Sequence, residues 1–174
     1  MTNNLPMDPD GDPLTGLLNR RSMWTAAPWL TPFPRGVAFV MLNIIDLKGI
    51  NDKLGHAFGD RVLVETAHRV QRIAGDLPVW RIGGDDFLIA RHVGGADDLR
   101  RFARGLRTAI EQWRDGISVG VWMGGAIASP DCNVADELLQ LADLAMYHAA
   151  RRRTRELIIE PDDTWDSRFR PPRP

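Results

Sequence analysis

A chain of 174 residues, of which 44% are hydrophobic and 7% aromatic, is long enough for one compact core and too short for two. Its 22 Lys and Arg residues against 23 Asp and Glu residues give a net charge of −1, which excludes a general attraction to nucleic acid or anionic lipid. Any binding of phosphate must therefore be local.

The single cysteine, Cys132, cannot form an internal disulfide. The first residues, MTNNLPMDPDGD, lack the basic region and the apolar run of a signal peptide, and no stretch approaches the roughly 20 apolar residues that cross a bilayer. We therefore expect a soluble cytoplasmic protein. Residues 1–11 and 161–174 are rich in Pro, Asp and other polar residues, so we expect flexible tails around one folded domain over residues 12–160.

In chain order, the first expected element is a helix from about Leu14 to Trp24. The run GVAFVMLNII at 36–45 is too dense in apolar residues for a solvent-facing strand and predicts a central one. The polar segment after it is expected to form a turn. From Phe58, apolar residues recur at helical spacing as far as Gly75, where the helix should end.

Residues 78–91 predict a β-hairpin. PVWRI at 78–82 and FLIAR at 87–91 are strand-like and flank GGDD, whose glycines allow positive φ and whose aspartates tolerate a turn. Asp85 and Asp86 should therefore lie at its tip. Taken alone, GGDD is also ordinary composition for an exposed turn.

The remaining pattern predicts a helix over 99–113, a strand region over 117–128, a helix over 138–149 and a short strand over 156–160. Strands and helices are interleaved, yet one pair of strands forms a hairpin. We therefore expect an α+β fold in which helices pack on a mixed, mainly antiparallel sheet.

Four segments carry a resemblance to a known family. DPLTGLLNRR at 12–21, LKGINDKLGHAFGD at 47–60, RIGGDDF at 81–87 and ADLAMYHAA at 142–150 match, in order and spacing, the signatures of GGDEF domains, the diguanylate cyclases. The resemblance implies a palm-like fold, similar to that of adenylyl cyclases, with a five-stranded sheet flanked by helices. It also implies that two GTP molecules are joined into cyclic di-GMP with release of pyrophosphate, one GTP being held by each domain of a homodimer.

The resemblance assigns Asp85 and Asp86 to a site for Mg²⁺ or Mn²⁺. Two cations held by carboxylates would lower the pKa of the attacking 3′-hydroxyl and stabilise the leaving group, and a shared cation offsets the repulsion between neighbouring aspartates. Lys48 resembles a family lysine near the phosphates or the metal, with an ordinary solvated lysine as the alternative. The expected catalytic residues are thus Asp86, Asp85 and Lys48.

The same resemblance assigns Asn51 and Asp60 to recognition of guanine. A carboxylate accepts from the ring N–H and the amino group of the base, and an amide offers a donor and an acceptor. The alternatives are a helix cap for Asp60 and a turn residue for Asn51. Gly83 and Gly84 would let the backbone approach the nucleotide, or serve only the geometry of the turn.

Two departures from the family pattern affect the metal site. Where active relatives place a metal-binding aspartate at the end of the central strand, this chain has Asn43, whose neutral amide is a weaker ligand for a hard cation. Asp46 is close by but would need a bulge to replace it, because it has the opposite parity on a regular strand. Asp86 stands where the family usually has Glu, and its shorter arm displaces the carboxylate.

The basic residues also depart from the pattern. The family carries a Lys and an Arg for the triphosphate at the positions of Ala150 and Thr154, whereas Arg151 and Arg155 keep the same spacing one residue out of register. On a helix that offset is a rotation of about 100°, which directs both arginines away from the phosphates unless the backbone shifts.

Three arginines, Arg20, Arg21 and Arg81, also match family positions. An alternative role for each is to hold loops together by pairing with a carboxylate such as Asp12.

Two hypotheses of function follow. In the first, the domain is a diguanylate cyclase of reduced activity that uses Asp85, Asp86 and a weaker ligand at Asn43. In the second, it is an inactive member of the family that binds GTP, cyclic di-GMP or a protein partner. The retained GGDD tip favours the first, and the missing aspartate favours the second.

Overall fold

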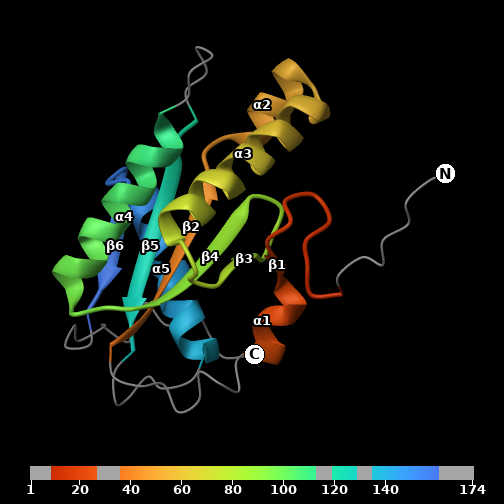
Figure 1. Cartoon of the computed structure of the whole chain (residues 1–174). Helices are drawn as coiled ribbons and strands as arrows, with labels where there is room; N and C mark the ends of the chain where they lie inside the picture. The colour runs from red at the N-terminus through yellow and green to blue at the C-terminus, as the bar shows by residue number, and fades with distance from the viewer. Residues whose placement is uncertain (1–8, 27–35, 113–118, 129–134, 161–174) are drawn as a thin grey trace, which may run out of the picture.

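The computed structural model describes residues 9–26, 36–112, 119–128 and 135–160 (Figure 1). The strands are β1 (Leu18–Asn19), β2 (Val37–Ile44), β3 (Val79–Arg81), β4 (Asp86–His92), β5 (Val121–Ile127) and β6 (Glu156–Ile159). The helices are α1 (Arg20–Ala26), α2 (Leu47–Leu54), α3 (His56–Ala74), α4 (Ala96–Glu111) and α5 (Ala135–Arg152). Within these ranges, none of the helices is both long and apolar enough to span a membrane.

The described strands form one sheet in the order β1-β3-β4-β2-β5-β6. The central strand β2 pairs antiparallel with β4 and β5, and β3 pairs antiparallel with β4 as the predicted hairpin. The outer pairs β1–β3 and β5–β6 are parallel. The predicted α+β class with a mixed, mainly antiparallel sheet is confirmed. The sheet has six strands rather than the expected five, because the two-residue β1 adds to the edge at β3.

Helices cover both faces of the sheet, with α3 and α4 on one side and α5 on the other (Figure 1). Alternate residues of β2 divide between the two layers. Val40 and Leu42 belong to the core shared with α3 and α4, whereas Phe39 and Met41 belong to the core shared with α5. Asn43 continues the second set, so its side chain projects toward the α5 side.

The packing of α5 on β5 is unusually close. A Cβ on Gly124 would clash with the backbone of Met146 and with the carbonyl of Ala142, so a glycine is required there.

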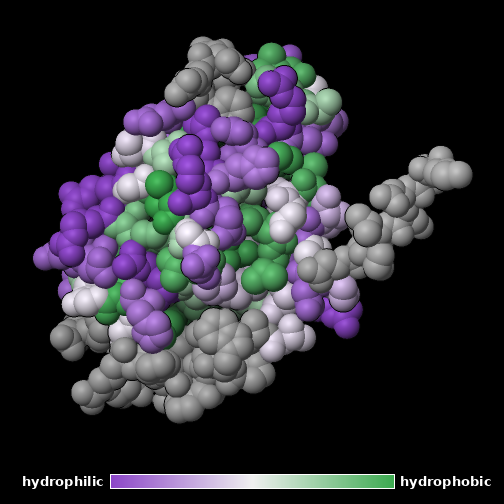
Figure 2. Space-filling view, viewed as in Figure 1, coloured by the Kyte–Doolittle hydropathy of each residue, from purple (hydrophilic) through white to green (hydrophobic). Residues whose placement is uncertain are grey.

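On the opposite side of the molecule, the outward surface of α4 is largely hydrophilic (Figure 2), and it carries exposed residues such as Asp97 and Arg101. The amphipathic pattern of α4 is that of a helix with one solvated face.

Two sequence predictions were wrong in the N-terminal third. The first helix begins at Arg20 rather than near Leu14. Asp12 accepts hydrogen bonds from the backbone N–H and the hydroxyl of Thr15, which holds residues 13–15 in a turn, and Asn19 caps α1 by accepting from the N–H of Ser22.

The segment predicted as a turn after β2 is instead the helix α2. Asp46 has a left-handed φ of 55° and caps this helix by accepting from the N–H of Gly49 at 3.1 Å. This cap excludes Asp46 from the role of a strand residue that replaces Asn43. Trp113, the strand residues 117–118, Cys132 and the predicted tail 161–174 lie outside the described residues, as do residues 1–8 of the other tail.

The C-terminus of α5 is closed by two hydrogen bonds. The N–H of Thr154 donates to the carbonyl of Ala149, and the N–H of Arg153 donates to the carbonyl of Ala150. This is the Schellman pattern, in which the residue after the helix takes a left-handed conformation and is usually glycine. Here that residue is Arg153, with a φ of 55°.

Replacing Arg153 by glycine is expected to raise the free energy of unfolding by about 1 kcal/mol, because glycine adopts a positive φ without a Cβ penalty. Urea and thermal unfolding of both proteins measure the difference. Arg152→Gly, one residue earlier and inside α5, is the matched control and should lower stability by up to about 1 kcal/mol. Equal stability of wild type and Arg153→Gly would contradict the left-handed conformation.

Candidate functional site

The centre of the candidate site is a contact between β2 and β4. Asn43 and Asp86 are directly paired in the sheet, and Nδ2 of Asn43 donates a hydrogen bond of 2.9 Å to Oδ1 of Asp86. The hairpin tip is tied to the same strand end, because the carbonyl of Asp85 accepts from the N–H of Ile44 at 3.2 Å. The structure thus brings Asn43, Asp85 and Asp86 together, as the sequence predicted.

The carboxylate of Asp86 lies in an environment that disfavours its charge. Burial raises its pKa, the hydrogen bond from Asn43 lowers it, and the neighbouring charge of Asp85 raises it again, with a net increase above the usual value. A positive charge at this site would reverse that balance.

A further carboxylate, which the sequence analysis missed, belongs to this environment. Asp143 of α5 has a raised pKa because its carboxylate is partly buried and because the charge of Asp86 is close to it, although the residue as a whole remains exposed. The segment ADLAMYHAA marks Asp143 as a polar residue beside the buried Ala142. Its direction toward Asp86 depends on the tight packing of α5 on β5 and could not be read from that pattern.

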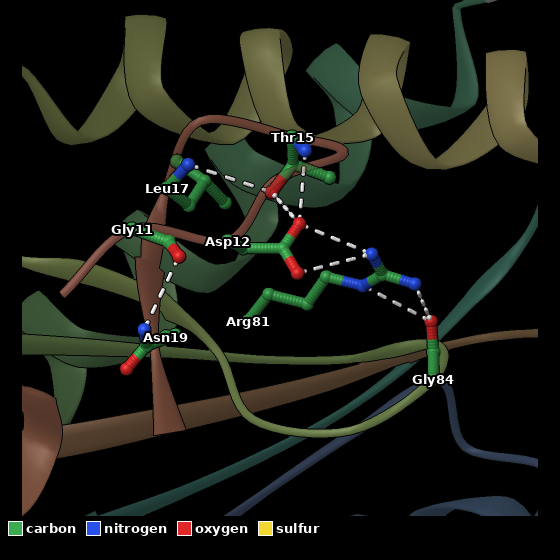
Figure 3. A network of polar contacts seen from close by, with 7 residues as sticks. All are labelled: Gly11, Asp12, Thr15, Leu17, Asn19, Arg81 and Gly84. Carbon is green, nitrogen blue, oxygen red and sulfur yellow. Dashed lines mark hydrogen bonds and ion pairs between the residues drawn. The ribbon is translucent and has the colours of Figure 1, made fainter. Parts of the chain in front are cut away.

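The hairpin tip is held by Arg81, the last residue of β3 (Figure 3). Its Nη1 contacts Oδ1 and Oδ2 of Asp12 at 3.1 and 3.3 Å, and its Nε and Nη2 donate to the carbonyl of Gly84 at 3.2 and 2.7 Å. One guanidinium therefore links the turn at residues 12–15 to the glycines before Asp85. The predicted pairing of Arg81 with Asp12 is confirmed.

Asp12 is strongly engaged in this clamp. Burial raises its pKa, but the hydrogen bonds from Thr15 and the contact with Arg81 outweigh burial and lower it below the usual value. The side chains of Arg81 and Asp12 are only 13% and 16% exposed, so solvent screens the pair less than a surface salt bridge.

Asn51 lies inside α2, and its side-chain oxygen packs against the backbone of Gly59 in α3. A Cβ on Gly59 would overlap Oδ1 of Asn51, so only glycine leaves room for it. This oxygen is buried and has no hydrogen-bond donor among the described residues. Asp60 follows Gly59 directly and is exposed. The structure therefore places the two predicted guanine-binding residues beside each other.

The alternatives for this pair do not hold. The N-cap of α3 is Gly55, which makes no side-chain cap, so Asp60 is the fifth residue of the helix and not its cap. Asn51 is a helical residue whose carbonyl accepts from the N–H of Gly55, so it is not a turn former.

Lys48 is exposed in the first turn of α2, beyond the end of β2. Among the contacts of the described residues, Lys48 makes no hydrogen bond or ion pair with Asp85 or Asp86, and its role stays a prediction.

The two late arginines take different directions. Nη1 of Arg151 donates to the hydroxyl of Tyr147 at 2.9 Å on the exposed surface of α5. Arg155 lies beyond the end of α5, and its Cζ lies 5.2 Å from the ring centroid of Trp122. The expected rotation of about 100° does not apply to Arg155, because the helix stops at Arg152 and the chain turns back.

Asn43, Asp85 and Asp86 fit a divalent cation that is also bound by the phosphates of a ligand. Oδ2 of Asp86 lies 2.6 Å from the point where a Cβ on Gly83 would sit, so a side chain there would close the space beside that oxygen. Across the described ranges, no three His, Cys, Asp or Glu side chains are gathered closely enough to hold a metal ion. Mg²⁺ commonly binds one or two carboxylates together with substrate phosphates. The residues fit a cation that arrives with phosphate better than a preassembled protein cage.

Comparisons with known proteins identify one family. The family model for "Diguanylate cyclase, GGDEF domain" matches residues 10–156. Diguanylate cyclase VdcA of Vibrio cholerae is 33% identical over 147 residues, which are 79% of this chain and 43% of VdcA. Curated relatives that are 31% to 36% identical are longer proteins, and the chain spans 18% to 62% of their length.

Solved structures share the fold. The isolated GGDEF domain of PA1120 (TpbB or YfiN) from Pseudomonas aeruginosa superposes with a TM-score of 0.74 at 30% identity, covering 88% of this chain and 96% of that one. The GGDEF domain of DgcB from Caulobacter crescentus, solved in complex with c-di-GMP, gives a TM-score of 0.80 at 23% identity and covers 88% of this chain and 98% of that one. The fold expected from the resemblance is therefore confirmed.

A double-mutant cycle with Asp12→Ala and Arg81→Ala is expected to give a coupling free energy of about 1–3 kcal/mol at pH 7, because the pair is largely buried and multiply hydrogen-bonded. Since the pKa of Asp12 is lowered in the fold, this stabilisation is present above the ordinary aspartate pKa of about 3.9 and is lost as the pH falls through the lower value.

Urea unfolding of the four proteins measures the coupling. The exposed pair Asp97 and Arg100 on α4 is the matched control and should give less than about 1 kcal/mol. A coupling no larger than that of the control pair would show that Arg81 does not clamp the hairpin.

Proposed function

The chain belongs to the GGDEF domain family of cyclic di-GMP signalling, and from this premise we propose that it binds GTP and condenses two GTP molecules into cyclic di-GMP at a reduced rate. Each condensation joins a 3′-hydroxyl oxygen to an α-phosphorus and releases pyrophosphate. One observation carries the proposal: Asp86 is held at the end of β2 beside the neutral amide of Asn43 at 2.9 Å. Asp86 provides a carboxylate at this position, whereas its neighbour Asn43 carries no charge.

In this proposal, guanine binds where Asn51 meets the start of α3. The amide of Asn51 offers a donor and an acceptor to the base, and the exposed carboxylate of Asp60 accepts from the ring N–H and the amino group of guanine. A site built to make these bonds disfavours adenine, because adenine has no ring N–H to donate to the carboxylate. Support comes from the close packing of Asn51 on Gly59, which fixes the amide next to Asp60.

The phosphates are proposed to lie across the hairpin tip. Gly83 and Gly84 present backbone without a side chain, and the clamp from Arg81 to the carbonyl of Gly84 keeps that backbone in place. Lys48, exposed in the first turn of α2, supplies a cation that can reach the phosphates.

Asp85, Asp86 and the amide of Asn43 would hold Mg²⁺ or Mn²⁺ together with the phosphates of the nucleotide. When bound, the cation lowers the pKa of the attacking hydroxyl and stabilises the negative charge of the leaving pyrophosphate. Asp86 is the anionic member nearest to Asn43, and Oδ1 of Asp86 is already oriented by the hydrogen bond from that amide. A weaker cation site follows, because hard cations depend on carboxylate charge.

One domain holds one GTP in this proposal, so the condensation needs two domains facing each other. A homodimer is therefore part of the proposed active state. Formation of the dimer places the 3′-hydroxyl of one nucleotide against the α-phosphate of the other. This alignment costs entropy, and the free energy of association of the two chains has to offset that cost.

The second candidate function is binding of GTP or cyclic di-GMP, or of a protein partner, without turnover. The observation that favours it is the same hydrogen bond, because it engages one oxygen of Asp86 with a neutral donor in place of a second metal-binding carboxylate. The two candidates differ in one measurable respect, the release of pyrophosphate.

Purified protein incubated with GTP and Mg²⁺ or Mn²⁺ is expected to yield cyclic di-GMP and pyrophosphate slowly, and Asp86→Ala should abolish the product. Chromatography of the nucleotides and a pyrophosphate assay measure both. Asp97→Ala, which removes an exposed acid of α4, is the control and should leave the rate unchanged. GTP binding without product from wild type at any protein concentration would establish the second candidate.

Asn43→Asp is expected to raise the affinity for Mg²⁺ and to raise turnover by at least about tenfold, because a charged ligand replaces a neutral one. The same change should lower the stability of the metal-free protein, since two carboxylates would then face each other where Asn43 now donates to Asp86. Thermal unfolding with and without Mg²⁺, together with the pyrophosphate assay, measures both effects. Asn43→Ala, which removes the amide without adding charge, is the matched control, and an equal rate for Asp and Ala at this position would place Asn43 outside the metal site.

A further inference from the structure

The outer side of α5 carries a line of exposed side chains. Its inner side is buried on the sheet and consists mostly of alanines, which lets the helix pack closely on β5. On the opposite side, exposed residues recur at intervals of three and four, the spacing that aligns side chains along a helix. We call this line the outer ridge of α5, and its members are Asp136, Gln140, Asp143, Tyr147 and Arg151.

The charges at the two ends of α5 have opposite signs. Asp136 and its neighbour Glu137 lie in the first turn, and Arg151 and its neighbour Arg152 lie in the last turn. This distribution favours the helix dipole. It also leaves the charges unpaired, because none of these four residues forms an ion pair with another residue that the structure describes.

Helix α4 shows how the same chain treats a helix that faces solvent. Its first-turn acids are paired with arginines one turn later, Asp97 with Arg100 and Asp98 with Arg101. Mixing of the two signs at such short spacing is typical of a solvated helix. In α5 the two signs are separated by the length of the helix, so its charges can pair only with another molecule.

Tyr147 adds a large apolar contact to the ridge. Its side chain is 51% exposed. Nη1 of Arg151 donates to its hydroxyl at 2.9 Å, and the ring of His148 stands edge-on to it with the centroids 5.5 Å apart. These contacts restrain the ring, so less side-chain freedom is lost when a partner covers it. A tyrosine beside an arginine is the composition found at the energetic centre of protein interfaces.

The ridge is complementary to itself when two copies of α5 lie antiparallel. A twofold axis near Asp143, in the middle of the helix, places Asp136 of one copy opposite Arg151 of the other, and the symmetry repeats this contact. The same arrangement places Tyr147 opposite Gln140 of the other copy. A parallel arrangement would instead bring like charges together. Charge therefore selects a second copy of this chain in the antiparallel orientation.

This axis lies beside the candidate site. Helix α5 covers the face of the sheet to which Asn43 projects (Figure 1), and the charge of Asp86 acts on the carboxylate of Asp143. An antiparallel pair of α5 helices would thus bring two candidate sites to the two sides of one axis. A condensation of two nucleotides requires such an approach. The two Asp143 side chains also meet near the axis, and their like charges limit the affinity.

We propose that the outer ridge of α5 is the surface on which a second copy of this chain docks, antiparallel and about a twofold axis, with Asp136 paired to Arg151 of the partner subunit. This inference deepens the proposed function and rests on it for the need to bring two nucleotide sites together. One pair of helices covers less than the roughly 1,600 Å² of a standard interface, so the dimer is weak.

Sedimentation equilibrium of the full chain, at low salt and without nucleotide, tests the proposal. Asp136→Arg and Arg151→Asp should each weaken association by at least about tenfold, because both symmetry-related contacts change from attraction to repulsion. An equal mixture of the two variants should regain association to within about threefold of wild type, since each contact in the mixed dimer again joins an arginine to an aspartate. A folding defect in either variant cannot produce recovery on mixing.

Tyr147→Ala should also weaken association by at least about tenfold, because the contact is lost twice in a symmetric dimer. Asp97→Arg is the matched control, since Asp97 occupies in α4 the same place in the first turn that Asp136 occupies in α5. It should change association by less than about twofold. Thermal unfolding shows that each variant is folded.

The outcomes separate this inference from the proposed function. If wild type forms a dimer that Asp136→Arg and Arg151→Asp leave intact, the second copy docks elsewhere, so the inference fails and the proposed function stands. A wild-type protein that stays monomeric up to about 1 mM overturns the inference, and the separated charges then serve the helix dipole alone. If association depends on the ridge but the dimer releases no pyrophosphate from GTP, the inference stands and the proposed function fails.

Discussion

The register of the central strand β2 determines the arrangement of the site. Seven of its eight residues are buried and Asn43 is the exception, so a slip by one residue would exchange the side chains of the two apolar layers and separate Asn43 from Asp86. That register pairs Asn43 with Asp86 on one side and with Trp122 on the other. The hydrophobic packing of β2 therefore also determines which polar side chains meet at the end of the sheet.

A neutral amide at position 43 changes the balance between stability and chemistry. The hydrogen bond from Asn43 lowers the pKa of Asp86, which burial and Asp85 raise. The amide thus relieves part of the repulsion that a second carboxylate would add, and the ligand-free fold is stabilised. The same neutrality weakens the attraction for a cation. The hydrogen bond from Asn43 to Asp86 that stabilises the ligand-free protein therefore opposes the proposed turnover.

The sequence predicted most of the sheet and the long helices, because their signals are periodic and local. Leu63, Ala67 and Val70 mark one face of α3, and the glycines of the GGDD segment mark the hairpin. It did not predict α2, whose segment LKGINDKL contains residues of low helix propensity and depends on the cap from Asp46. The partner of Arg81 was predicted as one alternative among several. The direction of Asp143 toward Asp86, and of Arg155 toward Trp122, depends on close packing and on left-handed residues that leave no periodic signal.

Binding and turnover depend on different parts of the structure. The proposed guanine pair rests on packing between α2 and α3, where Gly59 leaves room for the amide of Asn51, and it requires no cation. The proposed chemistry rests on charge at the end of β2, where Asn43 has none. Loss of charge at one strand end leaves the helix–helix packing intact, so a member of this family can keep its nucleotide while its rate falls. The clamp from Arg81 to Asp12 and Gly84 serves both, because it holds the hairpin tip independently of the residue at position 43. The clamp therefore keeps the backbone of the tip in place whichever rate the proposed site supports.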